Sequence, residues 1–217
     1  MLDFAAARAR MVESQLRPNA ITDVGVLEAM ASVAREDFVP ADRRSLAYMD
    51  GDVPVGGNRY LMEPMVFGRL LQLAEIGPSD RVLDIGCATG YGAAVLAQIA
   101  QSVVAIDEDK ALADEAARIL RQLGAGNVTV AALPHADGDA AQGPYDAIVI
   151  EGRVPVVPAK LFDQLKEGGR LVAVVGDADL ARAMLYRRNG SIGSYTAFDA
   201  SVQQLPGIVA ANPAFVF

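Results

Sequence analysis

The sequence is poor in the residues that disulfides, metal centres and nucleophilic triads require. Its 217 residues include one cysteine, Cys87, one histidine, His135, and no tryptophan. A single cysteine excludes an intramolecular disulfide, and histidine, cysteine and carboxylate side chains do not cluster at metal-ligand spacing. We therefore predict no metal site, and we expect Cys87 to be a small packing residue and His135 to lie at the surface.

Basic residues and long apolar runs are also scarce. There are 19 lysines and arginines against 27 acids, a net charge of −8, which is the wrong sign for a partner with a phosphate backbone. No apolar run reaches the roughly 18 residues of a membrane span, and Asp3, Arg8 and Arg10 interrupt the start where a signal peptide would be apolar. We predict a cytoplasmic protein that binds neither nucleic acid nor membrane.

Short apolar segments and helical patterns alternate along most of the chain. Apolar residues recur at helical spacing over 3–17 and 24–34, with Thr22 or Asp23 as the N-cap of the second helix, whereas 35–64 is rich in turn formers. From Met65 a helix runs to about Ala74. The strands expected after it are 81–86, 102–107, 127–132, 145–152 and 170–176, the helices between them are 91–100, 109–124 and 159–166, and 180–188 with 191–199 form a terminal hairpin.

Buried strands separated by helices are typical of a doubly wound α/β protein with a mostly parallel sheet. We predict this fold, with an N-terminal helical segment and substrate-side loop over 1–64 and one compact α/β domain over 65–217.

A glycine-rich turn follows the first expected strand. Gly86 and Gly90 lie between that strand and a helix, where small residues let the backbone approach a ligand, and Asp84 precedes them. The dinucleotide spacing GxGxxG is not met, because Ala88 replaces its second glycine. Asp107 ends the next strand, and a carboxylate there can accept hydrogen bonds from ribose hydroxyls. We predict a nucleotide-type pocket; the alternative is a turn without a ligand.

Longer motifs carry a resemblance to a known family. The chain resembles the protein-L-isoaspartate O-methyltransferases, class I methyltransferases that use S-adenosylmethionine, from about residue 8 to residue 176. The matching stretches are RMVESQLRPNAITDVGVLEAMASVAREDFVP (10–40), AYMDGDVPVG (47–56), RVLDIGCATGYGAAVLA (81–97), LGAGNVTV (123–130), YDAIVIEG (145–152) and VPAKLFDQLKEGGRLVAVVG (157–176).

The resemblance implies a Rossmann-like class I fold and S-adenosylmethionine as cofactor. Tyr91, which follows Gly90, is a further candidate ligand neighbour. The resemblance implies that Asp107 holds the ribose and that the methionine portion lies against Asp84, Gly86, Cys87 and Gly90. The implied reaction is methyl transfer to the carboxylate of an L-isoaspartyl residue in a damaged protein or peptide. A carboxylate is ionised at neutral pH, so no general base is needed and catalysis is by positioning.

The sequence departs from the family pattern at the substrate and adenine ends. Residues 58–64 stand where the family has GQTISQP, which puts Met62 at the position of the active-site serine. Pro134 stands at the position of an aspartate that contacts adenine, with Asp137 as the candidate replacement. Glu151 and Arg153 add charge to the pocket rim. The candidate substrate-side residues are Asn58, Arg59, Tyr60, Met62, Glu151 and Arg153.

These departures leave three functional hypotheses open. The first is carboxyl methylation of isoaspartyl residues. The second keeps the cofactor but changes the acceptor, with Arg59 and Arg153 forming a fork for another anion. The third is a catalytically silent member that binds the cofactor or a partner, and it rests on the loss of the serine at Met62.

Overall fold

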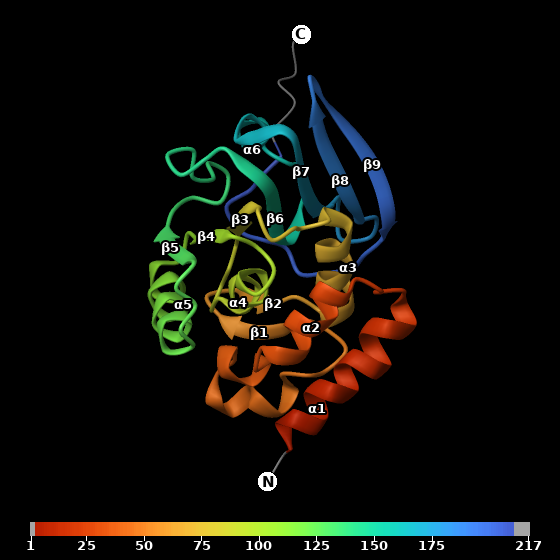
Figure 1. The fold of residues 1–217 in the computed structure, drawn as a ribbon, viewed down its shortest axis with the longest axis vertical. Coiled ribbons are helices and arrows are strands. Elements are labelled where there is room, and N and C mark those ends of the chain that lie inside the picture. Colours follow the sequence, from red (N-terminus) through yellow and green to blue (C-terminus); the bar gives the residue numbers. More distant parts are fainter. Residues whose placement is uncertain (1–2, 211–217) are drawn as a thin grey trace.

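The computed structural model describes residues 3–210, and a seven-stranded sheet forms its centre (Figure 1). The strand order is β5-β4-β3-β6-β7-β8-β9, parallel from β5 to β7 and antiparallel from β7 to β9. The strands are β3 (Arg81–Ile85), β4 (Ser102–Asp107), β5 (Val128–Ala132), β6 (Tyr145–Val154), β7 (Leu165–Val175), β8 (Arg182–Asn189) and β9 (Ser191–Asp199). The predicted mostly parallel sheet and the terminal hairpin are confirmed.

Helices cover both faces of the sheet because successive strand residues point to opposite sides. Val82 belongs to an apolar cluster with α3 (Pro64–Ala74), α4 (Tyr91–Ala97) and α5 (Lys110–Gln122). The next residue, Leu83, belongs to the cluster on the opposite face, which includes α6 (Ala159–Asp163) together with Leu205 and Ile208. The second face therefore depends on the chain after β9 for part of its cover.

The N-terminal segment forms helices and a small hairpin beside this sheet (Figure 1). Asp23, one of the two candidates, is the N-cap of its second helix and accepts a hydrogen bond from the backbone N–H of Val26 at 2.9 Å. The elements are α1 (Phe4–Met11), a π-helical turn (Val12–Leu16), a 3₁₀ turn (Arg17–Asn19), α2 (Val24–Ser32), two 3₁₀ helices (Arg35–Phe38, Ala41–Leu46) and the hairpin of β1 (Val53–Gly56) and β2 (Arg59–Leu61).

The fully buried side chain of Arg35 ties this segment to α4. Its guanidinium donates to the carbonyl oxygens of Ala47 and Met62, each at 2.7 Å, and lies 4.6 Å from the ring centroid of Tyr91. Arg35 thereby fixes the chain on both sides of the β1–β2 hairpin against the first helix after the glycine turn.

Three expected helices end at least three residues earlier than predicted, and one of them, expected over 91–100, ends at Ala97. The first regular α-helix ends at Met11 rather than at 17, where π-helical and 3₁₀ turns replace it. The helix expected over 159–166 ends at Asp163, because the next residues pair with β6: the carbonyl oxygen of Gln164 accepts from the backbone N–H of Tyr145 at 2.8 Å. Within 3–210, no helix is long and apolar enough to cross a membrane.

Candidate functional site at the strand tips

Three buried carboxyl groups gather where the central strands end. Asp84 is on β3, Asp107 is at the end of β4 and Glu151 is near the end of β6, and the exposed fractions of these residues are 0%, 0% and 4%. Strands β4 and β6 flank β3, with Asp84 opposite Ala105 on one side and Val149 on the other. Parallel sheets bind ligands at this edge, where the strand order reverses.

The glycine turn lies between these carboxyl groups, as predicted. Gly86, Ala88 and Gly90 have φ angles of 83°, 48° and 94°, in the region that glycine adopts most easily. The turn is held to β4, because the backbone N–H groups of Gly86 and Cys87 donate to the carbonyl oxygen of Ile106 at 2.8 and 3.0 Å. Cys87 is fully buried with a free thiol, which agrees with a packing role.

Asp107 points toward this turn and is ionised. Its carboxylate accepts from the Ala88 backbone N–H at 2.9 Å, from the Asp109 backbone N–H at 3.0 Å and from Arg59 Nε at 3.1 Å. Burial raises the pKa of Asp107, but the adjacent His135 ring, the Arg59 charge and the backbone donors outweigh burial and lower the pKa to about 2. The prediction that Asp107 lies at the strand tip is therefore correct, but its carboxylate already binds Arg59 of the same chain.

Arg59, one of the candidate substrate-side residues, lies against the glycine turn. It reaches in from β2, is 3% exposed, and donates through Nη2 to the carbonyl oxygen of Gly86. A Cβ added to Gly86 would meet Arg59 Nη2 at 2.7 Å and Leu205 Cδ1 at 2.6 Å. A cavity of about 10 Å³ lies beside Arg59 and Glu151, at the lower limit for one water molecule. The hollow expected at the turn is filled.

Asp84 and Glu151 form a second, unbalanced pair of carboxyl groups. Both oxygens of Asp84 and Oε1 of Glu151 have no hydrogen-bond donor within the described chain. Burial, and then the neighbouring Glu151, raise the pKa of Asp84 well above its usual range. Burial likewise raises the pKa of Glu151 to about 7, against the opposing effects of Asp84 and the Arg59 charge. The pair thus holds a proton near neutral pH, and its free oxygens suit a cationic group.

Glu151 was expected at the pocket rim, but it lies beside the start of α4. A Cβ added to Gly92 would lie 1.7 Å from Glu151 Oε1, so the glutamate uses space that only glycine leaves free at this helical position. Gly92 and Glu151 therefore depend on each other.

This dependence predicts a reversal of sign in a double-mutant cycle. We expect Gly92→Ala to lower the free energy of unfolding by about 1–3 kcal/mol, because the side chain of Glu151 must move. In a Glu151→Ala background we expect Gly92→Ala to raise the free energy of unfolding by up to about 1 kcal/mol, because alanine has a higher helix propensity than glycine. Urea unfolding of the four proteins measures both effects. Equal effects of Gly92→Ala in the two backgrounds would show that the residues are independent.

The other substrate-side candidates do not form an anion site. Met62 is buried, Tyr60 is half-buried, and Asn58 is exposed in the hairpin turn with a φ of 57°. Arg153 donates to the carbonyl oxygen of Gly176 at 3.1 Å, whereas Arg59 is held by Asp107. The proposed fork of the two arginines is therefore wrong, since each guanidinium has a different partner within the protein.

The adenine end also differs from expectation. Asp137 pairs with Lys160 at 2.7 Å on the surface, so it does not replace the family aspartate at Pro134. His135 was expected at the surface but is fully buried, with Nε2 3.5 Å from Oδ1 of Asp107. The only sequence signal that His135 lies near the site was its position directly after Pro134 in the segment compared with the family.

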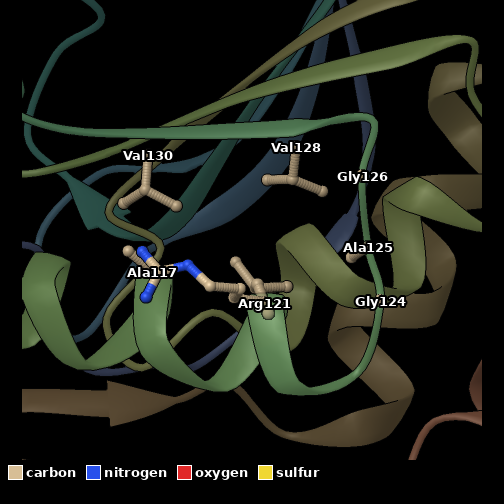
Figure 2. A pocket seen from close by; sticks show the side chains of 8 residues that line it. Ala117, Arg121, Gly124, Ala125, Gly126, Val128 and Val130 are labelled. Carbon is tan, nitrogen blue, oxygen red and sulfur yellow. The ribbon is translucent and has the colours of Figure 1, made fainter.

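A larger groove of about 390 Å³ lies elsewhere, between α5 and β5. Figure 2 shows Val128 and Val130 pointing from β5 toward the helix, with Arg121 across from them. Its glycine-rich wall, 124–126, leads into the amino end of β5, the opposite edge from the three carboxyl groups. Arg121 is its one titratable lining residue. Within 3–210, no three histidine, cysteine, aspartate or glutamate side chains are arranged to hold a metal ion.

Comparison with known proteins agrees with this architecture. The family model of protein-L-isoaspartate(D-aspartate) O-methyltransferase matches residues 7–204. The chain is 39% identical over 196 residues to a protein-L-isoaspartate O-methyltransferase of Koribacter versatilis, covering 90% of this chain and 88% of the relative. It is 43% identical over 189 residues to protein-L-isoaspartate O-methyltransferase 1 of Rhodopseudomonas palustris, covering 85% and 75%. The chain belongs to the protein-L-isoaspartate O-methyltransferase family.

Two solved structures with names of this family share the fold. A protein-L-isoaspartate O-methyltransferase superposes with a TM-score of 0.81 at 24% identity, over 92% of this chain and 66% of the other. A Plasmodium falciparum protein, described as a putative member in complex with S-adenosyl-L-homocysteine, superposes with a TM-score of 0.80 at 18% identity, over 92% of this chain and 98% of the other. At these identities the likeness establishes the class I methyltransferase fold alone.

Proposed function

We propose that this chain is an S-adenosylmethionine-dependent methyltransferase that modifies a carboxylate of a protein or peptide, with an L-isoaspartyl residue as the acceptor that family membership favours. One observation carries the proposal. Asp84, whose buried oxygens have no donor among residues 3–210, and Asp107, at the next strand tip, face the same glycine turn. A cytoplasmic location is part of the proposal and rests on the sequence.

The residues around the turn fit this cofactor by type. The free oxygens of Asp84 suit an ammonium or sulfonium charge, the Asp107 carboxylate suits a ribose diol, and Gly86 leaves room that a Cβ would fill. The bound cofactor supplies an electrophilic methyl group. The space beside Gly86 now holds Arg59 and Leu205, so these side chains must move for the group to enter.

The protein contributes binding and positioning rather than a base for this acceptor. An isoaspartyl carboxylate with an ordinary pKa of about 4 is already ionised at neutral pH. The buried strand tips exclude water and strengthen the electrostatic effect of the fixed carboxyl groups. Met62 offers a thioether, which donates no hydrogen bond, where the family has serine.

A second candidate keeps the cofactor and changes the acceptor. Glu151 favours it, because a carboxyl group with a pKa of about 7 can take a proton from a neutral acceptor near physiological pH. A hydroxyl or amine acceptor requires such a base, whereas a carboxylate does not.

Labelled methyl transfer tests the proposal. With tritiated S-adenosylmethionine we expect base-labile label in an isoaspartyl peptide and none in the matched aspartyl peptide. Asp84→Asn should lower the rate by at least about tenfold, since an amide nitrogen, which cannot accept a hydrogen bond, replaces one of the two acceptor oxygens that face the turn. Asp114→Asn, at an exposed ion pair with Lys110 on α5, is the control and should leave the rate unchanged. Label confined to base-stable products would favour the second candidate, and equal label in both peptides would contradict isoaspartyl specificity.

A further inference from the structure

Arg59 and the chain after β9 occupy the space beside the glycine turn. We call residues 200–208 the strap. Resting on the proposed function, we propose that Arg59 and the strap form an internal plug of the cofactor site, and that S-adenosylmethionine binds only when both leave the turn. Arg59 falls within the segment 58–64, which the resemblance compares with GQTISQP.

Arg59 is bound as a cationic ligand would be. Its Nε pairs with Asp107 at 3.1 Å and its Nη2 donates to the Gly86 carbonyl oxygen, so one guanidinium bridges the tip of β4 and the turn after β3. The side chain is 3% exposed. A ligand that hydrogen-bonds to Asp107 through a ribose must therefore displace the guanidinium.

Leu205 fills the adjacent space from the strap. It is fully buried, and its Cδ1 lies 2.6 Å from where a Cβ of Gly86 would be. Hydrogen bonds hold the strap on both sides of this residue. The Leu205 backbone N–H donates to the Arg153 carbonyl oxygen at 2.9 Å, and His135 Nδ1 lies 2.9 Å from the carbonyl oxygen of Pro206.

The strap and the chain around the β1–β2 hairpin are joined through Asp52. One oxygen of Asp52 accepts from the backbone N–H of Gln203 at 2.6 Å, and the other accepts from the backbone N–H of Glu63 at 2.7 Å. The carboxylate thus connects the strap to the chain on both sides of the hairpin that carries Arg59. This connection couples the two parts of the plug, so loosening one part favours release of the other.

Charge makes Arg59 a competitor of the cofactor. The site holds Asp84, Asp107 and Glu151, and within the described residues Arg59 forms its ion pair with Asp107. S-adenosylmethionine carries a sulfonium that S-adenosylhomocysteine lacks, so repulsion from Arg59 acts more strongly on the former. Removing the arginine charge should improve binding of S-adenosylmethionine more than binding of the demethylated product.

Calorimetric titration of the full chain with both ligands tests the plug. Arg59→Gln introduces the residue of the family segment and keeps an amide that can donate to Asp107; Leu205→Ala removes the other half and leaves the ion pair. We expect each variant to lower the Kd for S-adenosylhomocysteine at least about tenfold, with a larger gain for S-adenosylmethionine in Arg59→Gln. Arg121→Gln, at an exposed arginine of α5, is the matched control and should bind as the wild type does.

The outcomes separate the plug from the proposed function. If both variants bind the two ligands no more tightly than the wild type does, the plug is overturned and the methyltransferase proposal still stands. No binding by either variant or by the double variant, when melting curves show that they are folded, overturns both. Hydrogen exchange gives a readout that does not depend on variants: ligand bound to the wild type should speed exchange over 200–208, and unchanged exchange in the bound state overturns the plug.

Discussion

Asp107→Ala is expected to lower the free energy of unfolding by about 3–5 kcal/mol, because it leaves the buried guanidinium of Arg59 without its partner. Arg59 and Asp107 are 3% and 0% exposed, so solvent cannot replace the lost carboxylate without local opening. Urea unfolding at neutral pH measures the loss. Asp114→Ala breaks an ion pair whose side chains are 76% and 67% exposed, and it should cost less than about 1 kcal/mol.

Lowering the pH should remove the contribution of Asp107 to the free energy of unfolding of the wild-type protein. The folded pKa of Asp107, about 2, is below the unfolded value of about 3.9, so its contribution is complete above pH 4 and is lost as the pH falls toward 2. The Asp107→Ala protein should lose less stability across that interval than the wild type does. Identical losses in the two proteins would show that Asp107 is not held as an ionised partner of Arg59.

Glu151→Gln is expected to raise the free energy of unfolding at pH 8 by about 1–3 kcal/mol. The folded pKa of Glu151, about 7, lies above the unfolded value of about 4.3, so its contribution is complete below pH 4 and is lost as the pH rises through 7. Glutamine cannot ionise, and its amide can donate to Asp84, whose oxygens have no donor. Unfolding in urea at several pH values from 5 to 8 measures the change.

The control for Glu151 is Glu28→Gln, at an exposed glutamate of α2. It should leave the pH dependence of stability unchanged, whereas Glu151→Gln should flatten it between pH 5 and pH 7. A loss of stability at pH 8 in Glu151→Gln would contradict the account, because it would mean that the Glu151 carboxylate has a stabilising partner.

The sheet and the turn could be predicted because their signals are local. Segments such as 81–86 are mostly apolar and end in glycine. A parallel sheet brings the tips of neighbouring strands to one edge. The expected positions of Asp84, Gly86 and Asp107 follow from that rule, and the structure places all three there. Cys87 could be interpreted in the same way, as a small residue in a tight turn.

The contents of the site could not be predicted, because they depend on contacts between distant parts of the chain. Arg59 and Asp107 are 48 residues apart, and no local pattern shows that the guanidinium turns inward. Leu205 lies beyond the region of family resemblance, so nothing pointed to its contact with Gly86. The close fit of Glu151 against Gly92 likewise depends on the shape of the folded chain, in which a strand tip meets a helix, and no local pattern reveals it.

The central claim is that the glycine turn between Asp84 and Asp107 is a cofactor site that the chain itself closes. A crystal structure of the Arg59→Gln protein with S-adenosylhomocysteine tests this most directly. We predict the ligand between the two aspartates, its ribose on Asp107, with Leu205 withdrawn from Gly86. Ligand density anywhere else, or a turn still covered by Leu205 at saturating ligand, would contradict the claim.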